Sequence, residues 1–337
     1  MDLLRKILFP LVPVYYSITW LRNLFYDIGL IRSTTYKFPL IKVGNLSVGG
    51  TGKTPMVEYL VRLLLKDHRT AVLSRGYKRK TTGLVIANNT TTIDAIGDEP
   101  FQMNQKFNNL IVAVDANRRR GIEALMQLEN APEVIVLDDA FQHRRVGSGL
   151  NILLTPYNDL YSNDIVLPTG NLREPRKGAQ RAQIIVVTKC PIKLTESAKQ
   201  DIIRRLKPKS YQYVFFSFIN YSETIIGESN RKDLSALNTD SFCLVTGIAN
   251  SQPLVDFLKG QNMNFEHMEY SDHHNFTHDE IAVLNTKKQI LTTEKDYGRL
   301  HGKITTEIYY IPIEIGISEG NNFNGLITNY VSNLRLS

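Results

Sequence analysis

The stretch SVGGTGKTP, Ser47 to Pro55, decides the fold of this chain because it joins a strand-like segment to a helix-like one. The apolar segment FPLIKVGN precedes it, and the run MVEYLVRLLL that follows has the spacing of an amphipathic helix. Gly49, Gly50 and Gly52 leave backbone N–H groups free to converge on oxyanions, and the N-terminus of the helix favours negative charge. The stretch is therefore predicted to bind the phosphates of a nucleotide.

The loop departs from the usual phosphate-loop pattern at its first position, where Ser47 stands in place of glycine. Lys53 is expected to reach the β- and γ-phosphates, and the Thr54 hydroxyl is expected to face Mg²⁺. The alternative is an ordinary glycine-rich turn, but the order of strand, loop, lysine, threonine and helix favours nucleotide binding. The predicted ATP-binding residues are Ser47, Val48, Gly49, Gly50, Thr51, Gly52, Lys53 and Thr54.

Outward from this loop, short β-branched segments alternate with longer amphipathic ones, which is typical of a parallel sheet with crossover helices. Two further segments, 211–219 and 307–317, are long and rich in Tyr and Phe, and a separate βα pattern lies between them. The sequence thus predicts an α/β fold with a parallel sheet flanked by helices and a second, smaller α/β domain joined by a two-strand connector. The strands expected in the main sheet are 38–45, 69–77, 110–115, 132–140, 150–157 and 182–190.

The length of 337 residues allows two domains of ordinary size. The sequence contains two cysteines, Cys190 and Cys243, and their spacing matches no metal-binding motif, which indicates a reducing compartment and two packed thiols. The predicted divisions are an N-terminal helix in 1–30, a nucleotide-binding domain in 31–212, connector strands with the smaller domain in 213–318, and a C-terminal helix in 319–337.

An apolar run from Ile7 to Trp20 lies between basic residues near the N-terminus. A spanning helix needs about 20 apolar residues. This run is shorter, contains Pro10 and Pro13, and is followed by no small-residue cleavage site. The sequence predicts neither a spanning helix nor a cleaved signal peptide. Two alternatives stay open, an interfacial helix drawn to anionic lipid and a helix packed on the protein's own core.

A pair of carboxylates, Asp138 and Asp139, follows a run of consecutive apolar residues. Such a pair in an exposed loop would ordinarily be solvated and would have no specific function. Here the apolar run is expected to carry both carboxylates to the carboxyl edge of the sheet, where open α/β sheets bind ligands. Metal binding is therefore predicted for this pair.

Eight short segments follow one another along the chain: NLSVGGTGKTP, LSRGY, GDEP, VLDDAFQHR, LPTGNLREP, VVTKC, DHH and TEKD. In these segments the chain resembles the tetraacyldisaccharide 4′-kinase family, and the resemblance covers nearly its whole length. The resemblance implies a P-loop kinase-like fold and a transfer of the γ-phosphate of ATP, with Mg²⁺, to the 4′-hydroxyl of a tetraacylated glucosamine disaccharide 1-phosphate, forming the lipid IVA stage of lipid A biosynthesis. It also implies a peripheral, monotopic protein at the cytoplasmic face of the bacterial inner membrane.

A lipid with four acyl chains stays in the bilayer, so the resemblance favours the interfacial helix. The net charge of +7 suits an anionic membrane surface and a phosphorylated lipid disaccharide as partners. Nucleic acid is not expected, because the basic residues are scattered and no aromatic platform interleaves them. No obligate protein partner is inferred.

For the general base, the resemblance suggests Asp98 of GDEP with His273 of SDHH, since a carboxylate keeps an imidazole oriented and basic. The alternatives are that either His273 or His274 caps the helix that follows, and that Asp98 is a helix cap. Lys53 and Asp139 are the other predicted catalytic residues. The predicted metal ligands are Thr54, Asp138, Asp139 and Glu99.

Arginine forks fit phosphate, and Asn and Glu can hold sugar hydroxyls. A run such as Arg118 to Arg120 is usually a solvated face, so more weight falls on Arg173 and Glu174. The TEKD element, 293–296, could contact adenine or ribose or cap a helix. The predicted substrate-binding residues are Arg75, Tyr77, Arg118, Arg119, Asn171, Arg173 and Glu174.

One alternative function is a membrane-associated partitioning-type ATPase, which also combines GGTGKT with a basic amphipathic segment. Such ATPases rely on an additional lysine early in the phosphate loop. In this chain Ser47 and Val48 precede the glycine pair, which counts against that class.

Overall fold

The computed structural model describes residues 5, 7–239, 242–272 and 274–335. The chain divides into two compact units, Met1–Phe218 with Ile315–Ser337, and Ile219–Glu314. It passes from the first unit to the second within β8 (Tyr213–Tyr221) and returns within β15 (Ile313–Ile317). Each unit has its own sheet.

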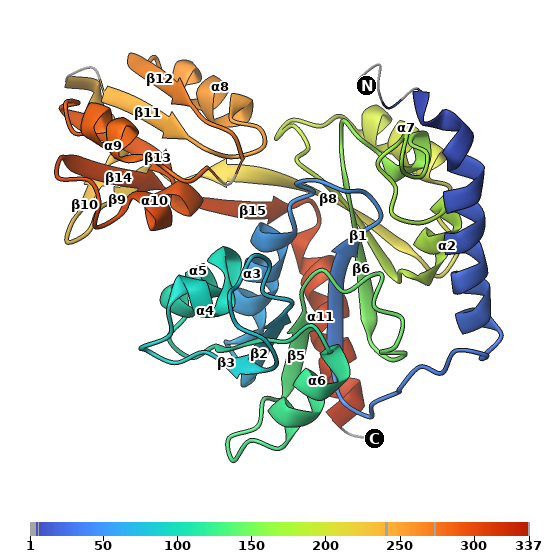
Figure 1. The fold of residues 1–337 in the computed structure, drawn as a ribbon. Helices are drawn as coiled ribbons and strands as arrows, with labels where there is room; N and C mark the ends of the chain where they lie inside the picture. Colours follow the sequence, from blue (N-terminus) through green and yellow to red (C-terminus); the bar gives the residue numbers. More distant parts are fainter. Residues whose placement is uncertain (1–4, 6, 240–241, 273, 336–337) are drawn as a thin grey trace. The chain divides into compact units, whose positions relative to one another are not determined.

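The first unit is built on a nine-stranded sheet in the order β15-β8-β7-β6-β1-β5-β2-β4-β3 (Figure 1). The pairs from β8 through β4 are parallel, and β3 is antiparallel to β4. The predicted α/β fold is confirmed, and each of the six predicted strands contains an observed one, because both faces of these Val/Ile/Leu runs are buried. The strands are β1 (Leu40–Asn45), β2 (Thr70–Ser74), β3 (Val85–Ile86), β4 (Ile111–Val114), β5 (Val134–Leu137), β6 (Leu150–Pro156) and β7 (Ile184–Thr188).

Helices cover both faces of this sheet. On one face α3 and α11 bury Met56, Leu60, Phe323 and Ile327 in a common apolar cluster with β1, β2 and β5. On the other face, α6 packs over β2 and β5, while α7 packs over β6 and β7. The helices and 3₁₀ turns of this unit are η1 (Phe9–Leu11), α2 (Val12–Asp27), α3 (Lys53–Leu64), α4 (Ile93–Ile96), α5 (Asp98–Lys106), α6 (Arg118–Met126), η2 (Tyr161–Asn163), η3 (Arg176–Arg181), α7 (Glu196–Leu206) and α11 (Gly320–Arg335).

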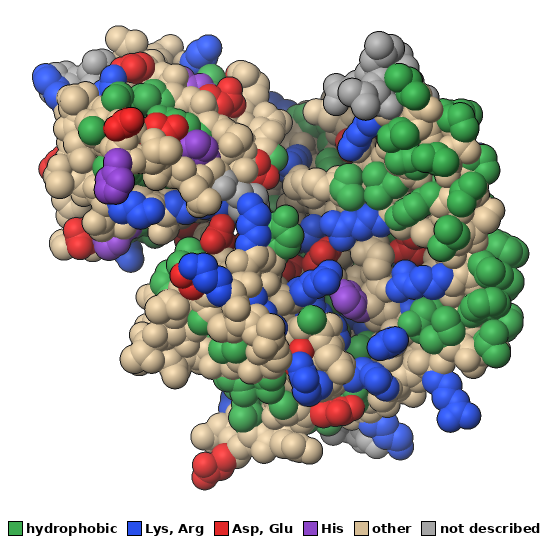
Figure 2. All heavy atoms as spheres, viewed as in Figure 1, with side chains coloured by type: hydrophobic (Ala, Val, Ile, Leu, Met, Phe, Trp, Pro, Cys, Tyr) green, Lys and Arg blue, Asp and Glu red, His purple; other side chains and the backbone are tan. Residues whose placement is uncertain are grey.

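The N-terminal helix α2 is held at the surface of the first unit. Val12 and Tyr15 pack against the cluster beneath α7, but no residue of α2 is buried. Val14 is 56% exposed and Ile18 is 62% exposed. Figure 2 shows the hydrophobic side chains that gather over α2. The helix therefore packs on its own unit along one side and presents an apolar face along the other.

The second unit holds a six-stranded sheet in the order β10-β9-β14-β13-β11-β12, with parallel pairing from β14 to β12. Its apolar cluster includes Leu244, Leu258 and Leu291. Its elements are β9 (Thr224–Ile226), β10 (Arg231–Asp233), η4 (Leu234–Thr239), β11 (Phe242–Thr246), α8 (Gln252–Gly260), β12 (Phe265–Glu269), α9 (His278–Leu284), β13 (Gln289–Thr293), α10 (Glu294–Leu300) and β14 (Glu307–Ile311).

Two sequence expectations concern single residues and membrane crossing. Cys190 and Cys243 are both buried free thiols, as predicted. Within the described part of the chain, none of the helices combines the length and hydropathy that crossing a bilayer requires.

Candidate active site

The phosphate loop runs from the end of β1 to the start of α3. Gly49 has φ +103° and Gly52 has φ +86°, a left-handed backbone that a residue with a Cβ rarely adopts. Gly52 is the N-cap of α3, and no side chain caps this end of the helix. The N–H groups of the first turn therefore point out of the helix without a capping hydrogen bond. These N–H groups are suited to phosphate oxygens.

Ser47 occupies the position where the usual loop has glycine, and the structure explains why a side chain fits. Ser47 forms an antiparallel bridge with Leu172, and the Val48 N–H donates to Asn171 O at 2.8 Å. This end of the loop is thus extended and is held by the GNLREP segment. An extended backbone accepts any L-residue, so glycine is not needed there.

The far side of the loop is held by the end of β7. Thr188 Oγ1 donates to Thr51 O at 2.8 Å, and Lys189 Nζ donates to Gly50 O at 2.6 Å. Neither residue was predicted as part of the site, although both lie in the VVTKC segment. The loop is therefore fixed from both sides in a conformation that leaves α3's first turn open.

Lys53 reaches from the first turn of α3 toward the end of β5. Its Nζ lies 3.5 Å from Asp139 Oδ1 and 3.5 Å from Asn45 Oδ1, both at the long limit for such contacts. Contacts of this length can be exchanged for shorter charge-assisted hydrogen bonds to phosphate oxygens.

The two neighbouring carboxylates that follow β5 have different environments. Asp138 is buried, its Oδ2 accepts from Ser74 Oγ at 3.3 Å, and its Oδ1 has no hydrogen-bond partner. Burial, with Glu99 and Asp139 nearby, raises the pKa of Asp138 to about 6. A buried carboxylate oxygen without a partner, close to other carboxylates, is a suitable ligand for a divalent cation.

Asp139 adopts φ +46°, a left-handed backbone conformation that is uncommon for a residue with a Cβ. Arg173 Nη1 lies 3.3 Å from Asp139 Oδ1 and 3.2 Å from Oδ2. Burial favours the neutral acid, but Lys53 and Arg173 outweigh it and hold the pKa of Asp139 below its usual range. Asp139 is therefore charged at neutral pH and bridges two cations.

The predicted metal ligands suit an Mg²⁺ ion that is bound partly by water and phosphate, rather than a metal ion held entirely by protein side chains. Among the described residues, no group of three or more His, Cys, Asp and Glu has metal-site geometry. Mg²⁺ usually keeps several waters and binds one or two carboxylates together with the substrate phosphates. Asp138, with Thr54 on the first turn of α3, matches that smaller ligand set.

Asp98 and Glu99 begin helix α5. The N-cap of α5 is Gly97, so Asp98 occupies the first helical position and is not the cap. A Cβ at Gly97 would lie 2.6 Å from Tyr77 O, which shows how closely the LSRGY and GDEP segments approach each other. Asp98 thus lies beside the segment that carries Arg75 and Tyr77.

His273 lies outside the described residues. Its neighbour His274 places Nε2 2.9 Å from Glu280 Oε2 and stacks on Tyr270. Helix α9 is capped by Thr277 in a reciprocal capping box with Glu280. His274 is therefore engaged within the second unit, and the helix cap is a different residue.

The candidate substrate residues fall into two groups. Arg75, Tyr77 and Arg119 are exposed. Arg118 is buried, donates to Asp115 O at 2.5 Å and to Asp138 O at 2.8 Å, and has a pKa lowered to about 10 by burial. Arg118 is thus placed to position Asp138, whereas Arg75, Tyr77 and Arg119 lie at the surface.

The GNLREP segment connects the site to helix α2. Arg5 Nη1 donates to Asn171 Oδ1 at 2.8 Å, and Tyr15 Oη donates to Arg173 O at 3.0 Å. Glu174 is buried and accepts from Asn23 at 2.8 Å and from Arg181 at 2.7 Å. The N-terminal helix α2 is therefore coupled to the phosphate site through Arg173 and Glu174, and Arg5, which precedes the helix, contacts the same segment at Asn171.

Two residues of the FQHR segment belong to this site and were not predicted individually. Gln142 Nε2 donates to Asn45 O at 2.7 Å, at the entrance to the phosphate loop. Burial, with Arg118 nearby, lowers the pKa of His143 to about 4, so its ring is neutral at physiological pH. Their place directly after Asp138 and Asp139 was the available signal.

The TEKD element has a structural role in the second unit. Asp296 is buried, accepts from the Gly247 N–H at 2.8 Å and from Thr293 Oγ1 at 2.7 Å, and pairs with Arg299. Thr293 is also the N-cap of α10. These contacts fix the turn between β13 and α10.

A family model described as tetraacyldisaccharide-1-P 4′-kinase matches residues 4–332 of the chain. The chain belongs to this family. The tetraacyldisaccharide 4′-kinase of Flavobacterium johnsoniae is 47% identical over 336 residues, which cover 98% of both chains. That of Phocaeicola vulgatus is 42% identical over 97% of this chain and 95% of its own.

Among solved structures, the fold is similar to that of LpxK from Aquifex aeolicus, crystallised in complex with ATP. The TM-score is 0.78 at 31% identity, over 98% of this chain and 100% of that one. The predicted family, the P-loop kinase fold and an ATP-dependent kinase are confirmed. The partitioning-type ATPase gains no support from these matches to the tetraacyldisaccharide 4′-kinase family.

Proposed function

We propose that this chain transfers the γ-phosphate of ATP to the 4′-hydroxyl of a tetraacylated glucosamine disaccharide 1-phosphate at the cytoplasmic face of the inner membrane. The observation that carries the proposal is the double role of Arg173. Its side chain contacts Asp139 in the phosphate site, and its carbonyl accepts from Tyr15 of the exposed apolar helix. A kinase for a membrane lipid needs such a connection between the phosphates and the bilayer.

Each group at the site then has a defined task. Lys53 and the first-turn N–H groups of α3 hold the phosphates in place and neutralise charge on the transferred group. Asp138 and Thr54 would hold Mg²⁺, and the nearby charges of Asp139 and Glu99 would also attract it. The bound ion would supply further neutralisation of phosphate charge. Arg75, Tyr77, Arg119 and Arg173 orient the disaccharide.

The decisive experiment uses purified protein, γ-labelled ATP and extracted disaccharide lipid. Label is expected in the lipid in a one-to-one ratio with the ATP consumed. ATP hydrolysis that proceeds at the same rate without lipid, with no label transferred, would identify a switch ATPase instead.

We further propose that Asp98 and His273 act together as the general base. His273→Ala and Asp98→Ala are each expected to lower kcat by about 10²-fold, the lower end for a general base, because a loose phosphoryl-transfer transition state needs little proton removal. ATP affinity should change little, since the phosphate loop is elsewhere in the sequence.

The double variant distinguishes a working pair from two independent residues. Residues that act as one unit are not additive, so the double variant should lose little more than either single one. His274→Ala, which removes the neighbouring imidazole, is the matched control. Fully multiplicative losses, or a normal His273→Ala enzyme, would contradict the paired base and would direct attention to Asp139.

The exposed face of α2 is expected to hold the protein at the bilayer. Val14→Ser with Ile18→Ser should lower binding to vesicles and raise the apparent KM for lipid in bilayers about tenfold, because each change removes apolar area from the interface. The KM for the same lipid in detergent micelles should change little.

These substitutions are preferable to deleting 1–30, which would also remove the contacts of Tyr15 and Asn23 with the site. Val283→Ser, at an exposed position of the second unit, is the control. Equal effects on micelle and bilayer lipid would show that the helix acts through packing rather than through the membrane.

A further inference from the structure

A basic cavity lies apart from the phosphate site, between the C-terminal end of α7 and the 3₁₀ turn η3. Its volume is about 360 Å³. Five of its lining residues carry positive charge, and none of the lining residues is Asp or Glu. The cations come from two separate segments, Arg176 and Lys177 from η3, and Arg205, Lys207 and Lys209 from the end of α7.

These five cations have no carboxylate within ion-pair distance in the part of the chain that the structure describes. On the same helix, Lys199 pairs with Glu196 and Arg204 pairs with Asp201. Ion pairs are therefore available to α7, but not to the side chains that line the cavity. Concentrated charge of one sign around a concavity attracts anions.

The dipole of α7 explains only part of this arrangement. Basic residues in the last turn of a helix interact favourably with its C-terminal carbonyls, which accounts for Arg205. Arg176 and Lys177 belong to η3, and Lys209 lies beyond the helix. Their convergence on the same cavity needs a different explanation.

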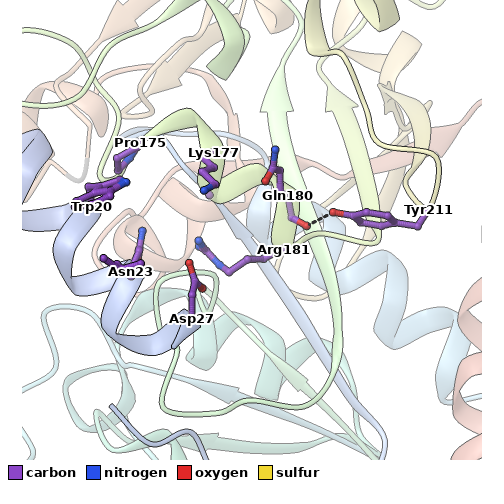
Figure 3. A pocket seen from close by; sticks show the side chains of 10 residues that line it. Trp20, Asn23, Asp27, Pro175, Lys177, Gln180, Arg181 and Tyr211 are labelled. Carbon is purple, nitrogen blue, oxygen red and sulfur yellow. Dashed lines mark hydrogen bonds between the residues drawn. The ribbon is translucent and has the colours of Figure 1, made fainter. Parts of the chain in front are cut away.

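A neighbouring cavity joins this basic surface to helix α2. It has a volume of about 310 Å³, shares Lys177 and Gln180 with the basic cavity, and is lined on its other side by Trp20, Asn23 and Asp27 of α2. Figure 3 shows these α2 side chains facing Lys177 and Arg181. It also shows the hydrogen bond that the Tyr211 hydroxyl donates to the backbone carbonyl of Gln180. The basic cavity and the cavity lined by α2 thus share the η3 turn as a common wall.

The surroundings also have the composition of a membrane interface. Tyr211 is 52% exposed and Tyr213 is 54% exposed, and Trp20 of α2 is 42% exposed. Tyr and Trp concentrate at the level of lipid headgroups, where one end of the ring is apolar and the other is wet. Clusters of four to eight basic residues beside an amphipathic helix are typical of anionic-lipid recognition.

We propose that the basic cavity binds the phosphodiester headgroup of an anionic phospholipid of the bilayer. This binding does not require the disaccharide substrate to be present. This proposal rests on the membrane location given under the proposed function. The occupant is a bilayer phospholipid because the charge is complementary and the apolar helix beside it would enter the same leaflet.

The test is the binding of the full chain to vesicles without ATP or disaccharide lipid. Vesicles of phosphatidylcholine are compared with vesicles that also contain phosphatidylglycerol. The variant Arg205→Gln/Lys207→Gln/Lys209→Gln is expected to lose at least about tenfold in binding to the anionic vesicles, since each basic residue near an anionic surface contributes appreciably to binding. Binding to neutral vesicles should not change.

The matched control is Lys66→Gln/Lys199→Gln/Arg204→Gln, which removes the same charge from outside the cavity. A loss as large as that of the cavity variant would mean that net charge alone attracts the protein, and the proposal would be wrong. The proposal would also be wrong if millimolar inorganic phosphate bound the wild-type chain but not the cavity variant, and the wild-type chain showed no preference for anionic vesicles. The cavity would then bind a soluble anion.

Kinase activity on micellar lipid separates this proposal from the proposed function. The cavity variant should phosphorylate micellar disaccharide at the wild-type rate. A matching fall in micelle activity would show that the cavity holds the substrate instead. If the wild-type chain had no kinase activity, the vesicle result would still decide the headgroup site.

Discussion

Lys53→Ala is expected to lower kcat by at least about 10²-fold while the fold survives, the usual scale for lost stabilisation of transition-state charge. The Nζ of Lys53 lies 3.5 Å from Asp139 Oδ1 and from Asn45 Oδ1, and Arg173 remains beside Asp139 when Lys53 is replaced, so the fold should survive with a modest loss of stability. The main task of Lys53 is therefore electrostatic and concerns the phosphates.

The measurement is steady-state transfer of labelled phosphate to micellar lipid, together with a thermal melt. Lys66→Ala, an exposed lysine just after α3, removes the same charge and should be silent. Lys53→Arg should recover only part of the rate, because a planar guanidinium cannot replace a compact ammonium. Near-normal turnover by Lys53→Ala would remove Lys53 from the phosphate site.

The strands of the main sheet could be predicted from the sequence because each is a short apolar run buried on both faces. The order of the strands could not, since pairing depends on contacts between distant segments. β1 lies between β5 and β6, which places the phosphate loop beside Asp138. The apolar run before Asp138 predicted that this carboxylate lies at the ligand-binding edge of the sheet, but not which strands are its neighbours.

Asp138 and Asp139 show where sequence reasoning stops. They are identical neighbours, and the sequence assigned both to metal binding. The left-handed backbone at Asp139 and the guanidinium of Arg173, far along the chain, give the two carboxylates opposite pKa shifts. No local pattern contains that information, because burial and long-range pairing produce it.

Arg118 and Glu174 make the same point for the substrate residues. Both were chosen for their chemistry, and both are buried with partners inside the protein. A buried arginine that donates to the backbone of Asp138 acts by positioning. Exposure, which only the fold determines, separates it from its neighbour Arg119.

Asp138→Asn is expected to lower kcat by about 10²- to 10³-fold and at the same time to stabilise the protein without nucleotide and Mg²⁺. The loss of rate follows from the loss of the charged metal ligand. Raising Mg²⁺ should recover part of the activity, because the amide oxygen of Asn is a weaker ligand of the same shape. Titration of the rate against Mg²⁺ measures this shift.

The gain in stability follows from the pKa of Asp138, which burial and the neighbouring Glu99 and Asp139 raise to about 6. The unfolded value is about 3.9. Between these values the folded state binds more protons than the unfolded state, so the free energy of unfolding falls as pH rises from about 4 to about 6. Above that range the buried charge costs about 3 kcal/mol.

Asn carries no charge, so the variant avoids this cost. Its Tm at pH 7.5 should exceed the wild-type Tm by a few degrees, and the difference should vanish near pH 4, where Asp138 is protonated in both states. Asp139→Asn is the matched control with the opposite sign. The pKa of Asp139 is lowered by Lys53 and Arg173 against the effect of burial, so its stabilising charge is present above about pH 4 and is lost below it.

Binding of Mg²⁺ with ATP should reverse the order of the two proteins. A ligand that binds only the folded state raises stability in proportion to its affinity, and the wild type binds the cation more tightly than Asp138→Asn. The wild-type Tm should therefore rise by more degrees than that of the variant. If Asp138→Asn melted below the wild type at pH 7.5 without ligands, Asp138 would be a stabilising structural carboxylate and the metal assignment would lose its main physical support.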